Sequence, residues 1–455
     1  MKKYDLLSIS PIDGRYSEVC HGMAEYFSEY ALIKNRVLVE VKWLIFLSDL
    51  KEIKSIPTLN TTSKNYLLKI YDNFSLKDAE KIKKLESTIK HDVKAVEYFI
   101  KGKIKNHPTL KKYIEHIHIC CTSEDINNLS YAMMIKEGIS SLSKKMESLD
   151  KLILNYVKKY SKNIMISHTH GQVATPSTMG KEFLNFYSRL SLLTDELSNT
   201  NIFGKFNGAT GNYSSHSIVF PNVNWPKANK KFVESFGIKE NKYTTQIEPH
   251  DYICSLSNKL SHYNSILIGF TQDIWLYISK NYFVQKNVKG EVGSSTMPHK
   301  INPINFENAE GNLGVANSLL NFFAEKLVIS RLQRDLSDST VLRNIGLAFS
   351  YSYLAYENII IGLKKISLNH KALDKDLTNA WEVLAEPIQM IARKYNVPNS
   401  YEILKKETRG KQVNQDVIKK IINLLDIPLA EKKLLLALTP KKYIGYSIKL
   451  CNGFK

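Results

Sequence analysis

The sequence has no hydrophobic run long enough to cross a membrane. Its longer uncharged tracts, such as residues 260–271, are interrupted by Ser, His and Asn. They fall short of the roughly 20 apolar residues that a spanning helix needs. The N-terminus reaches Asp13 and Arg15 before any apolar stretch resembling a secretion signal. We therefore expect a soluble cytoplasmic protein without membrane partners, whose 455 residues suggest two or three domains.

Cysteine is scarce, and its spacing argues against disulfides and metal sites. The number of cysteines is odd and the sequence contains no Cys-x-x-Cys pair. We read them as free thiols in a reducing cytosol: Cys20, Cys120, Cys121, Cys254 and Cys451. Two His-x-His pairs, at 116/118 and 168/170, lack accompanying cysteines or carboxylates at metal-ligand spacing. We expect neither a metal nor a cofactor.

Arginine is also scarce, although the net charge is +19. Only eight of the 63 basic residues are arginines, and the lysines are scattered among acidic and polar neighbours. That distribution fits a solvated surface at least as well as a nucleic-acid interface, so we expect no nucleic-acid partner. Four arginines fall in two short polar segments, where a guanidinium can bind carboxylate or phosphate bidentately: Arg15, Arg331, Arg334 and Arg343.

Apolar residues recur every three and four positions over residues 253–277, which predicts one long helix. The same pattern occurs over residues 142–160, 183–197 and 313–327. Helices that share this period pack side by side at shallow angles. No long stretch of the sequence shows the alternating apolar and polar pattern of β-strands. The sequence therefore predicts an all-α fold with an elongated central helical bundle.

The bundle is expected to occupy residues 111–366, after Pro108 and before the pattern breaks. Residues 1–110 read as a smaller N-terminal helical domain. Residues 367–455 read as a C-terminal helical domain punctuated by prolines. The helices have more apolar faces than one bundle is expected to bury, which suggests that helices from several chains pack together.

The segment GEVGSSTMPHKINPINFENAEGN, residues 290–312, interrupts the helical pattern with glycines, serines and prolines. We expect a mobile loop there. Asn302 and Pro303 have the character of an N-cap and first-turn pair, and Lys300 lies just before them. A helix N-terminus beside a lysine makes an anion site. An ordinary loop with a good cap explains the spacing equally well.

Two further segments contain residues typical of a helix start. In residues 169–183, Thr175 and Pro176 are expected to open the helix through residue 197, and His170 lies in the preceding loop, where it can serve as a proton donor. A histidine satisfied by local backbone is the alternative. In residues 121–128, Thr122 and Ser123 stand at a predicted helix start, as in many helices of no particular function.

Three segments carry polar residues that are not required for helix packing, although each also fits a solvated helix face: residues 90–98, 244–252 and 331–344. Glu307 falls in the first turn of the helix after the serine-containing loop. There it can accept a hydrogen bond from a histidine and fix its tautomer.

The motif GSSTMPHKINP resembles the signature GSSxMPxKxNP of the fumarase/aspartase superfamily. His299 within it resembles the adenylosuccinate lyase branch. The segments SPIDGRY, KHDVKAVEY, CTSEDINNLS, THGQ-ATPST, TTQIEPHDY and RDLSDSTVLRN resemble the bacterial members of that branch and occur in the same order. The resemblance covers nearly the whole chain.

This resemblance implies a carbon–nitrogen lyase with a fumarase/aspartase-like fold. Such an enzyme eliminates fumarate from adenylosuccinate, giving AMP, and from succinyl-aminoimidazole carboxamide ribotide, both in purine nucleotide biosynthesis. The family implies a homotetramer whose active sites combine segments of three chains, acting on small-molecule nucleotides.

The resemblance also assigns roles. Ser294 is the expected base, His170 the acid, Glu307 the residue that orients His170, and Lys300 a stabiliser of the carbanion. Phosphate is assigned chiefly to Arg15, Arg334 and Arg343, with His91 helping to position it. The succinyl carboxylates are assigned to Thr122, Ser123, Lys300 and Asn302. The remaining substrate-binding positions are Tyr16, Asp92, Gln246, Ser295, Asn308 and Ser339.

Two positions depart from the family pattern. Val173 stands where the histidine motif commonly has Pro, and Lys90 stands where this branch commonly has Asn. Lys90 adds positive charge beside the expected phosphate site and is predicted to tighten nucleotide binding. Three alternatives stay open: another fumarate-releasing lyase such as an argininosuccinate lyase, a basic helical scaffold for nucleic acid, and a catalytically silent superfamily member.

Overall fold

The computed structural model describes residues 6–286, 290, 296–297, 299–410 and 412–453. The chain divides into two compact units. Unit 1 comprises residues 1–146, 193–265 and 311–356, and unit 2 comprises residues 147–192, 266–310 and 357–455. Within the described ranges helices dominate, and short strands pair into three two-stranded sheets. The predicted all-α class is confirmed. The division into three domains at residues 110 and 366 stays a prediction.

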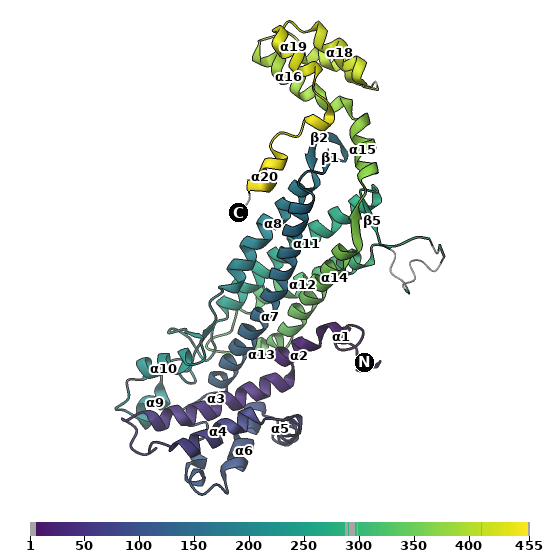
Figure 1. The fold of residues 1–455 in the computed structure, drawn as a ribbon. Helices are drawn as coiled ribbons and strands as arrows, with labels where there is room; N and C mark the ends of the chain where they lie inside the picture. Colours follow the sequence, from purple (N-terminus) through teal and green to yellow (C-terminus); the bar gives the residue numbers. More distant parts are fainter. Residues whose placement is uncertain (1–5, 287–289, 291–295, 298, 411, 454–455) are drawn as a thin grey trace. The chain divides into compact units, whose positions relative to one another are not determined.

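The N-terminal part of unit 1 is built around the long helix α3 (Glu29–Asp49). Ser28 caps this helix, because its hydroxyl accepts a hydrogen bond from the backbone N–H of Ala31. The neighbouring helices are α1 (Ser17–Cys20), α2 (Ala24–Phe27), α4 (Thr61–Asp72), α5 (Leu76–Ile89) and α6 (Asp92–Ile104), with the short 3-10 helices η1 (His21–Met23) and η2 (Leu110–His116). Helices α4, α5 and α6 contact α3, as Figure 1 shows.

Four long helices contain the predicted apolar periods: α7 (Ser123–Lys159), α8 (Met179–Ser198), α11 (Asp251–Ser279) and α12 (Ile304–Lys326). A fifth long helix, α14 (Ile345–Lys365), lies beyond those periods. In unit 1, the ring of Tyr263 on α11 packs against Tyr356 on α14 at 5.4 Å. In unit 2, Phe183 on α8 packs edge-on against Phe270 on α11 at 5.6 Å. Side-by-side packing of these helices therefore forms the core of each unit.

The predicted start of α8 at Thr175 and Pro176 is wrong. Both residues lie in β2 (Gln172–Thr178), which pairs antiparallel with β1 (Ile164–Thr169), and the helix begins at Met179. The strands are joined by His170 and Gly171, whose φ angles are +52° and +74°. Two left-handed residues in succession form the tight turn of a β-hairpin, and that turn outweighs the helix-start character of the Thr–Pro pair.

Smaller elements complete unit 1: α9 (Ser214–Val219), α10 (Trp225–Glu234), α13 (Ser337–Leu342), and the parallel strands β3 (Phe203–Gly204) and β4 (Lys239–Glu240). In unit 2, β5 (Phe283–Gln285) pairs antiparallel with β6 (Ile366–Leu368).

The C-terminal helices of unit 2 are α15 (His370–Asn379), α16 (Ala385–Lys394), α17 (Ser400–Thr408), α18 (Gln415–Leu424), α19 (Leu429–Leu436) and α20 (Ser447–Gly453), with η3 (Trp381–Leu384) and η4 (Pro440–Lys442). Helices α16, α18 and α19 gather into one cluster in Figure 1. Its core includes Leu384, Ile388, Ile421 and Leu425, and Ile166 of β1 joins the same core.

None of the helices in the described ranges has the length and apolar content to span a membrane. All five cysteines are free thiols, as predicted.

Candidate active site

Three of the polar segments singled out in the sequence meet at Arg334 in unit 1. One guanidinium nitrogen of Arg334 donates to the Glu124 carboxylate at 2.9 Å, and another donates to the side-chain oxygen of Gln246 at 3.1 Å. Glu124 lies in the first turn of α7, next to Thr122 and Ser123. The structure therefore brings together the segments 121–128, 244–252 and 331–344, which sequence reasoning treated separately.

A second contact holds segment 331–344 against segment 244–252. His250 Nε2 lies 3.4 Å from the Asp338 carboxylate, and both side chains are buried. The backbone N–H of Ser339 donates to the same carboxylate at 2.7 Å. Glu248 accepts from the backbone N–H of His250 at 2.8 Å, and burial raises the pKa of the Glu248 carboxyl. Ser339 therefore follows a residue, Asp338, that is held against segment 244–252.

Segment 90–98 joins this cluster through Asp92. The Asp92 carboxylate accepts from Arg36 at 2.7 Å and from Arg343 at 3.3 Å. Burial acts to raise the pKa of the Asp92 carboxyl, but the nearby guanidinium groups of Arg36 and Arg343 outweigh it and hold that pKa below its usual range. His91, beside it, caps α6 by accepting from the backbone N–H of Lys94 at 3.1 Å. Its side chain stays half-exposed.

Arg36 is the central residue that sequence reasoning missed. It is 1% exposed on α3 and also donates through Nε to Asn127 at 2.8 Å, while Asn127 donates to Glu124 at 2.9 Å. A continuous chain of hydrogen bonds therefore runs from Asp92 through Arg36 to Glu124. The available signal was a charged residue inside the apolar stretch ALIKNRVLVEVKWLIF, where Arg36 has another charge, Glu40, four positions later.

Glu40 is completely buried and pairs with His118 at 2.6 Å. Burial acts to lower the pKa of the His118 imidazole, but the Glu40 carboxylate outweighs it and raises that pKa above its ordinary value. His118 lies on the segment that leads into Thr122 and Ser123, whereas Glu40 lies on α3. The pair therefore joins that segment to α3.

The start of α7 is fixed by Asp125. Its carboxylate accepts from the backbone N–H of Thr122 at 2.9 Å and pairs with Lys205 at 2.9 Å, with both side chains of the ion pair fully buried. Because a buried charge needs compensating partners, the pairing fixes the backbone that presents Thr122 and Ser123. The helix begins at Ser123, as predicted.

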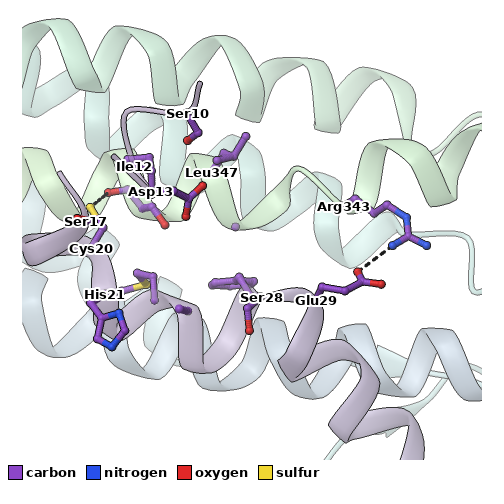
Figure 2. A pocket seen from close by; sticks show the side chains of 15 residues that line it. Ser10, Ile12, Asp13, Ser17, Cys20, His21, Ser28, Glu29, Arg343 and Leu347 are labelled. Atoms are coloured by element: carbon purple, nitrogen blue, oxygen red, sulfur yellow. Dashed lines mark hydrogen bonds and ion pairs between the residues drawn. The ribbon is translucent and has the colours of Figure 1, made fainter. Parts of the chain in front are cut away.

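Arg15 and Tyr16 lie at the N-terminal edge of unit 1. The Arg15 guanidinium is 5.9 Å from the Tyr16 ring centre. Residues on either side of them, between Ser10 and Glu29, line a cavity of about 530 Å³ together with Arg343 and Ser350. Figure 2 shows Arg343 and Glu29 at one end of this cavity and Asp13 farther along it.

In unit 2, His170 forms the exposed turn of the β1–β2 hairpin. Lys300 is exposed and precedes α12. The carbonyl of Pro303 accepts the first backbone hydrogen bonds of α12, so the helix begins one residue later than the Asn302–Pro303 pair predicted. Asn302 lies just before that start.

Glu307 and Asn308 follow in the first turn of α12. The Glu307 carboxylate accepts a hydrogen bond from the Trp275 indole N–H at 3.0 Å. Asn308 is half-buried. The role of Glu307 in orienting His170 stays a prediction. Ser294 and Ser295 lie outside the described residues.

The chain matches two family models. A model described as lyase matches residues 14–317, and a model described as adenylosuccinate lyase C-terminal matches residues 330–444. Two similar proteins, each named adenylosuccinate lyase, come from bacteria. That of Legionella pneumophila (strain Corby) is 49% identical over 450 residues, 99% of each chain. That of Escherichia coli (strain K12) is 46% identical over 466 residues, 100% of each chain.

Solved structures resemble this one at much lower sequence identity. A fumarate lyase from Mesorhizobium sp. BNC1 superposes with a TM-score of 0.77 at 14% identity, covering 95% of this chain and 97% of the other. A 3-carboxy-cis,cis-muconate lactonizing enzyme from Pseudomonas putida has a TM-score of 0.75 at 15% identity, covering 95% and 96%. At such identity the likeness shows the fold alone, and it confirms the expected fumarase/aspartase-like architecture.

Proposed function

Because this chain belongs to the adenylosuccinate lyase family, we propose that it eliminates fumarate from adenylosuccinate, giving AMP, and from succinyl-aminoimidazole carboxamide ribotide. The observation that carries this proposal is identity of 46–49% to proteins of that name over 98–100% of the chain. The cluster around Arg334 supports it, because three of the family-like segments converge there.

The chemistry requires removal of a proton from the carbon beside a carboxylate, with protonation of the departing nitrogen. The negative charge that develops spreads onto the carboxylate, so cations and N–H donors placed around that group lower the barrier. Lys300 and the N-terminus of α12 have the right charge for this task. Ser294 acts as the base and His170 as the acid. Glu307 orients the imidazole.

Recognition of the nucleotide is assigned mainly to the arginines of unit 1. The Nε of Arg334 is buried and, among the described residues, has no hydrogen-bond partner. A buried donor without a partner costs free energy, so it favours a ligand that supplies an acceptor. Arg15 and Arg343 share the phosphate with Arg334. His91 helps to position the phosphate, and Ser339, Tyr16, Asp92 and Gln246 bind the nucleotide.

The two succinyl carboxylates are assigned to different parts of the chain. Thr122 and Ser123 lie at the start of α7, whose backbone Asp125 fixes. Lys300 and Asn302 precede α12. Ser295 and Asn308 complete the substrate-binding set.

The protein is further proposed to act as a cytoplasmic homotetramer in which each active site takes segments from several chains. Supporting this, helices α11 and α12 carry large apolar side chains that are 41–49% exposed in the single chain: Trp275, Leu276, Val315 and Phe322. Exposed apolar surface of this kind on long helices is typical of faces that pack in oligomers. No metal or cofactor takes part.

Turnover of two related substrates tests the function. Purified protein is incubated with adenylosuccinate or with argininosuccinate, and fumarate release is measured. The proposal predicts release from adenylosuccinate at a much higher rate. Release mainly from argininosuccinate would establish the sibling activity instead. Absence of turnover together with salt-sensitive binding of RNA or DNA would favour the basic scaffold.

A further inference from the structure

Two carboxylates already bind the guanidinium group of Arg343, the group that the proposed function assigns to phosphate. One terminal nitrogen donates to Glu29 at 3.0 Å, and the other donates to Asp92 at 3.3 Å. Figure 2 shows the Glu29–Arg343 pair bordering the cavity. A phosphate that binds Arg343 must therefore take the place of a carboxylate or lie beside it.

The two carboxylates are held differently. Asp92 is 25% exposed and is also bound to Arg36 at 2.7 Å and to the backbone N–H of Val93 at 2.8 Å. Glu29 is 41% exposed, and its other partner is Lys83 at 3.1 Å, itself 46% exposed. Asp92 is fixed by a buried guanidinium. In the described part of the chain, Glu29 is paired with Arg343 and Lys83, whose side chains are 41% and 46% exposed, and exposed ion pairs are weak.

Within the ion-paired network around Arg343, positive and negative charges are equal in number. Arg36, Arg343 and Lys83 carry three positive charges, and Asp92, Glu29 and Glu86 carry three negative charges, with Lys83 also bound to Glu86 at 2.8 Å. A dianionic phosphate added to this cluster meets repulsion from the carboxylates. The repulsion is relieved most easily if Glu29 leaves Arg343, because Glu29 is the exposed and weakly held member.

We infer that Glu29 is a displaceable counter-ion that competes with the nucleotide phosphate for Arg343 and so lowers the affinity of the site for nucleotides. The inference rests on the proposed function, which places the phosphate at Arg343. Glu29 is a positioning residue in this account, because it acts on the ligand through Arg343. Asp92 keeps the guanidinium in place when Glu29 leaves.

The consequence is specific to the phosphate. Replacing Glu29 by Gln keeps the shape and the acceptor oxygen but removes the negative charge. Because exposed ion pairs are weak, we expect AMP to bind Glu29→Gln about two- to fivefold more tightly than the wild type. Adenosine, which has no phosphate, is expected to bind both proteins equally. The difference for AMP should shrink at high salt, where charges are screened.

The experiment is calorimetric titration of AMP and adenosine into the full-length wild type, Glu29→Gln and Glu25→Gln, at low and at high salt. Glu25 is an exposed carboxylate on the neighbouring helix α2 and is the matched control for a lost surface charge. The expected result is tighter AMP binding by Glu29→Gln alone, with adenosine unchanged.

Three outcomes overturn the inference while the wild type still binds AMP. They are an unchanged or weaker AMP affinity in Glu29→Gln, an equal gain in Glu25→Gln, and an equal gain for adenosine. If wild-type protein binds no AMP in this titration and releases no fumarate from adenylosuccinate, the proposed function itself fails and the inference falls with it.

Discussion

The guanidinium of Arg36 donates to the carboxylate of Asp92 over 2.7 Å, with the arginine side chain 2% exposed. The same arginine reaches Asn127, which in turn donates to Glu124, the partner of Arg334. Arg36 therefore joins the segments around residues 92 and 124 from inside unit 1. We expect Arg36 mainly to stabilise the fold, and to act on the substrate site through the segments that it holds together.

Removal of the Arg36 charge is expected to destabilise the protein strongly. Arg36→Met leaves Asp92 with a partly buried, less compensated charge and leaves Asn127 without a donor, a loss of about 3–5 kcal/mol for a broken buried pair. The urea midpoint measures the effect. Arg409→Met, which alters an exposed arginine, is the control and is expected to change stability by less than about 0.5 kcal/mol. Equal midpoints for the two variants would show that the ion pair does not stabilise the fold.

The His118–Glu40 pair predicts a pH dependence near neutrality. The pKa of His118 is raised in the folded protein by Glu40, against the effect of burial. A raised pKa means that its stabilisation is complete below the unfolded value of about 6.5 and is lost as the pH rises through the folded value. The urea midpoint of the wild type is therefore expected to fall between pH 6 and pH 9 by more than that of Glu40→Gln. Parallel pH profiles in the two proteins would contradict this.

Lys90 ends α5 in a left-handed conformation, with φ of +58°. Lysine is disfavoured there, whereas asparagine tolerates that region. The left-handed backbone at this position is therefore one that an asparagine fits better than a lysine. Lys90→Asn is expected to raise the free energy of unfolding by about 0.5 kcal/mol. Lys84→Asn, within the same helix, is the control and is expected to lower it, because asparagine is a weaker helix former than lysine.

The same substitution tests whether the Lys90 charge aids binding. Lys90 neighbours His91 and Asp92, so loss of its charge is expected to raise KM for adenylosuccinate modestly while kcat stays unchanged. A KM that is equal or lower in Lys90→Asn would remove the charge from any part in nucleotide binding.

Shared active sites are tested by mixing inactive variants. Ser294→Ala and His170→Ala are each expected to lose turnover by orders of magnitude while the oligomer persists, because each removes one proton-transfer group. If the two groups of one site come from different chains, subunit exchange between the variants restores a fraction of the sites. Recovered fumarate release measures this. Continued inactivity after exchange has been demonstrated would argue for sites within one chain.

The long helices were predictable because their packing follows directly from the sequence period. In α11, Ile253, Leu260 and Phe270 are each 1% exposed, as the spacing of three and four requires. The β1–β2 hairpin was not predictable in this way. Its strands are short and mixed in polarity, and it depends on left-handed backbone at His170 and Gly171. Thr175–Pro176 alone reads as a helix start.

The candidate site was predictable as a set of segments but not as a network. Polar residues such as Gln246 and Arg334 stood out along the chain, yet their 3.1 Å contact depends on the tertiary fold. A search for apolar periodicity passes over charged residues inside an apolar helix. It therefore missed Arg36 and Glu40. Their partners, Asp92 and His118, are 56 and 78 residues away.

The most direct measurement is the product balance of the purified protein with adenylosuccinate, followed by chromatography of AMP and fumarate in the same samples. We predict that both products appear in equal amounts from the first time point, and that His170→Ala forms neither at a comparable rate. Intact substrate after prolonged incubation with folded wild-type protein, or AMP formed without fumarate, would contradict it.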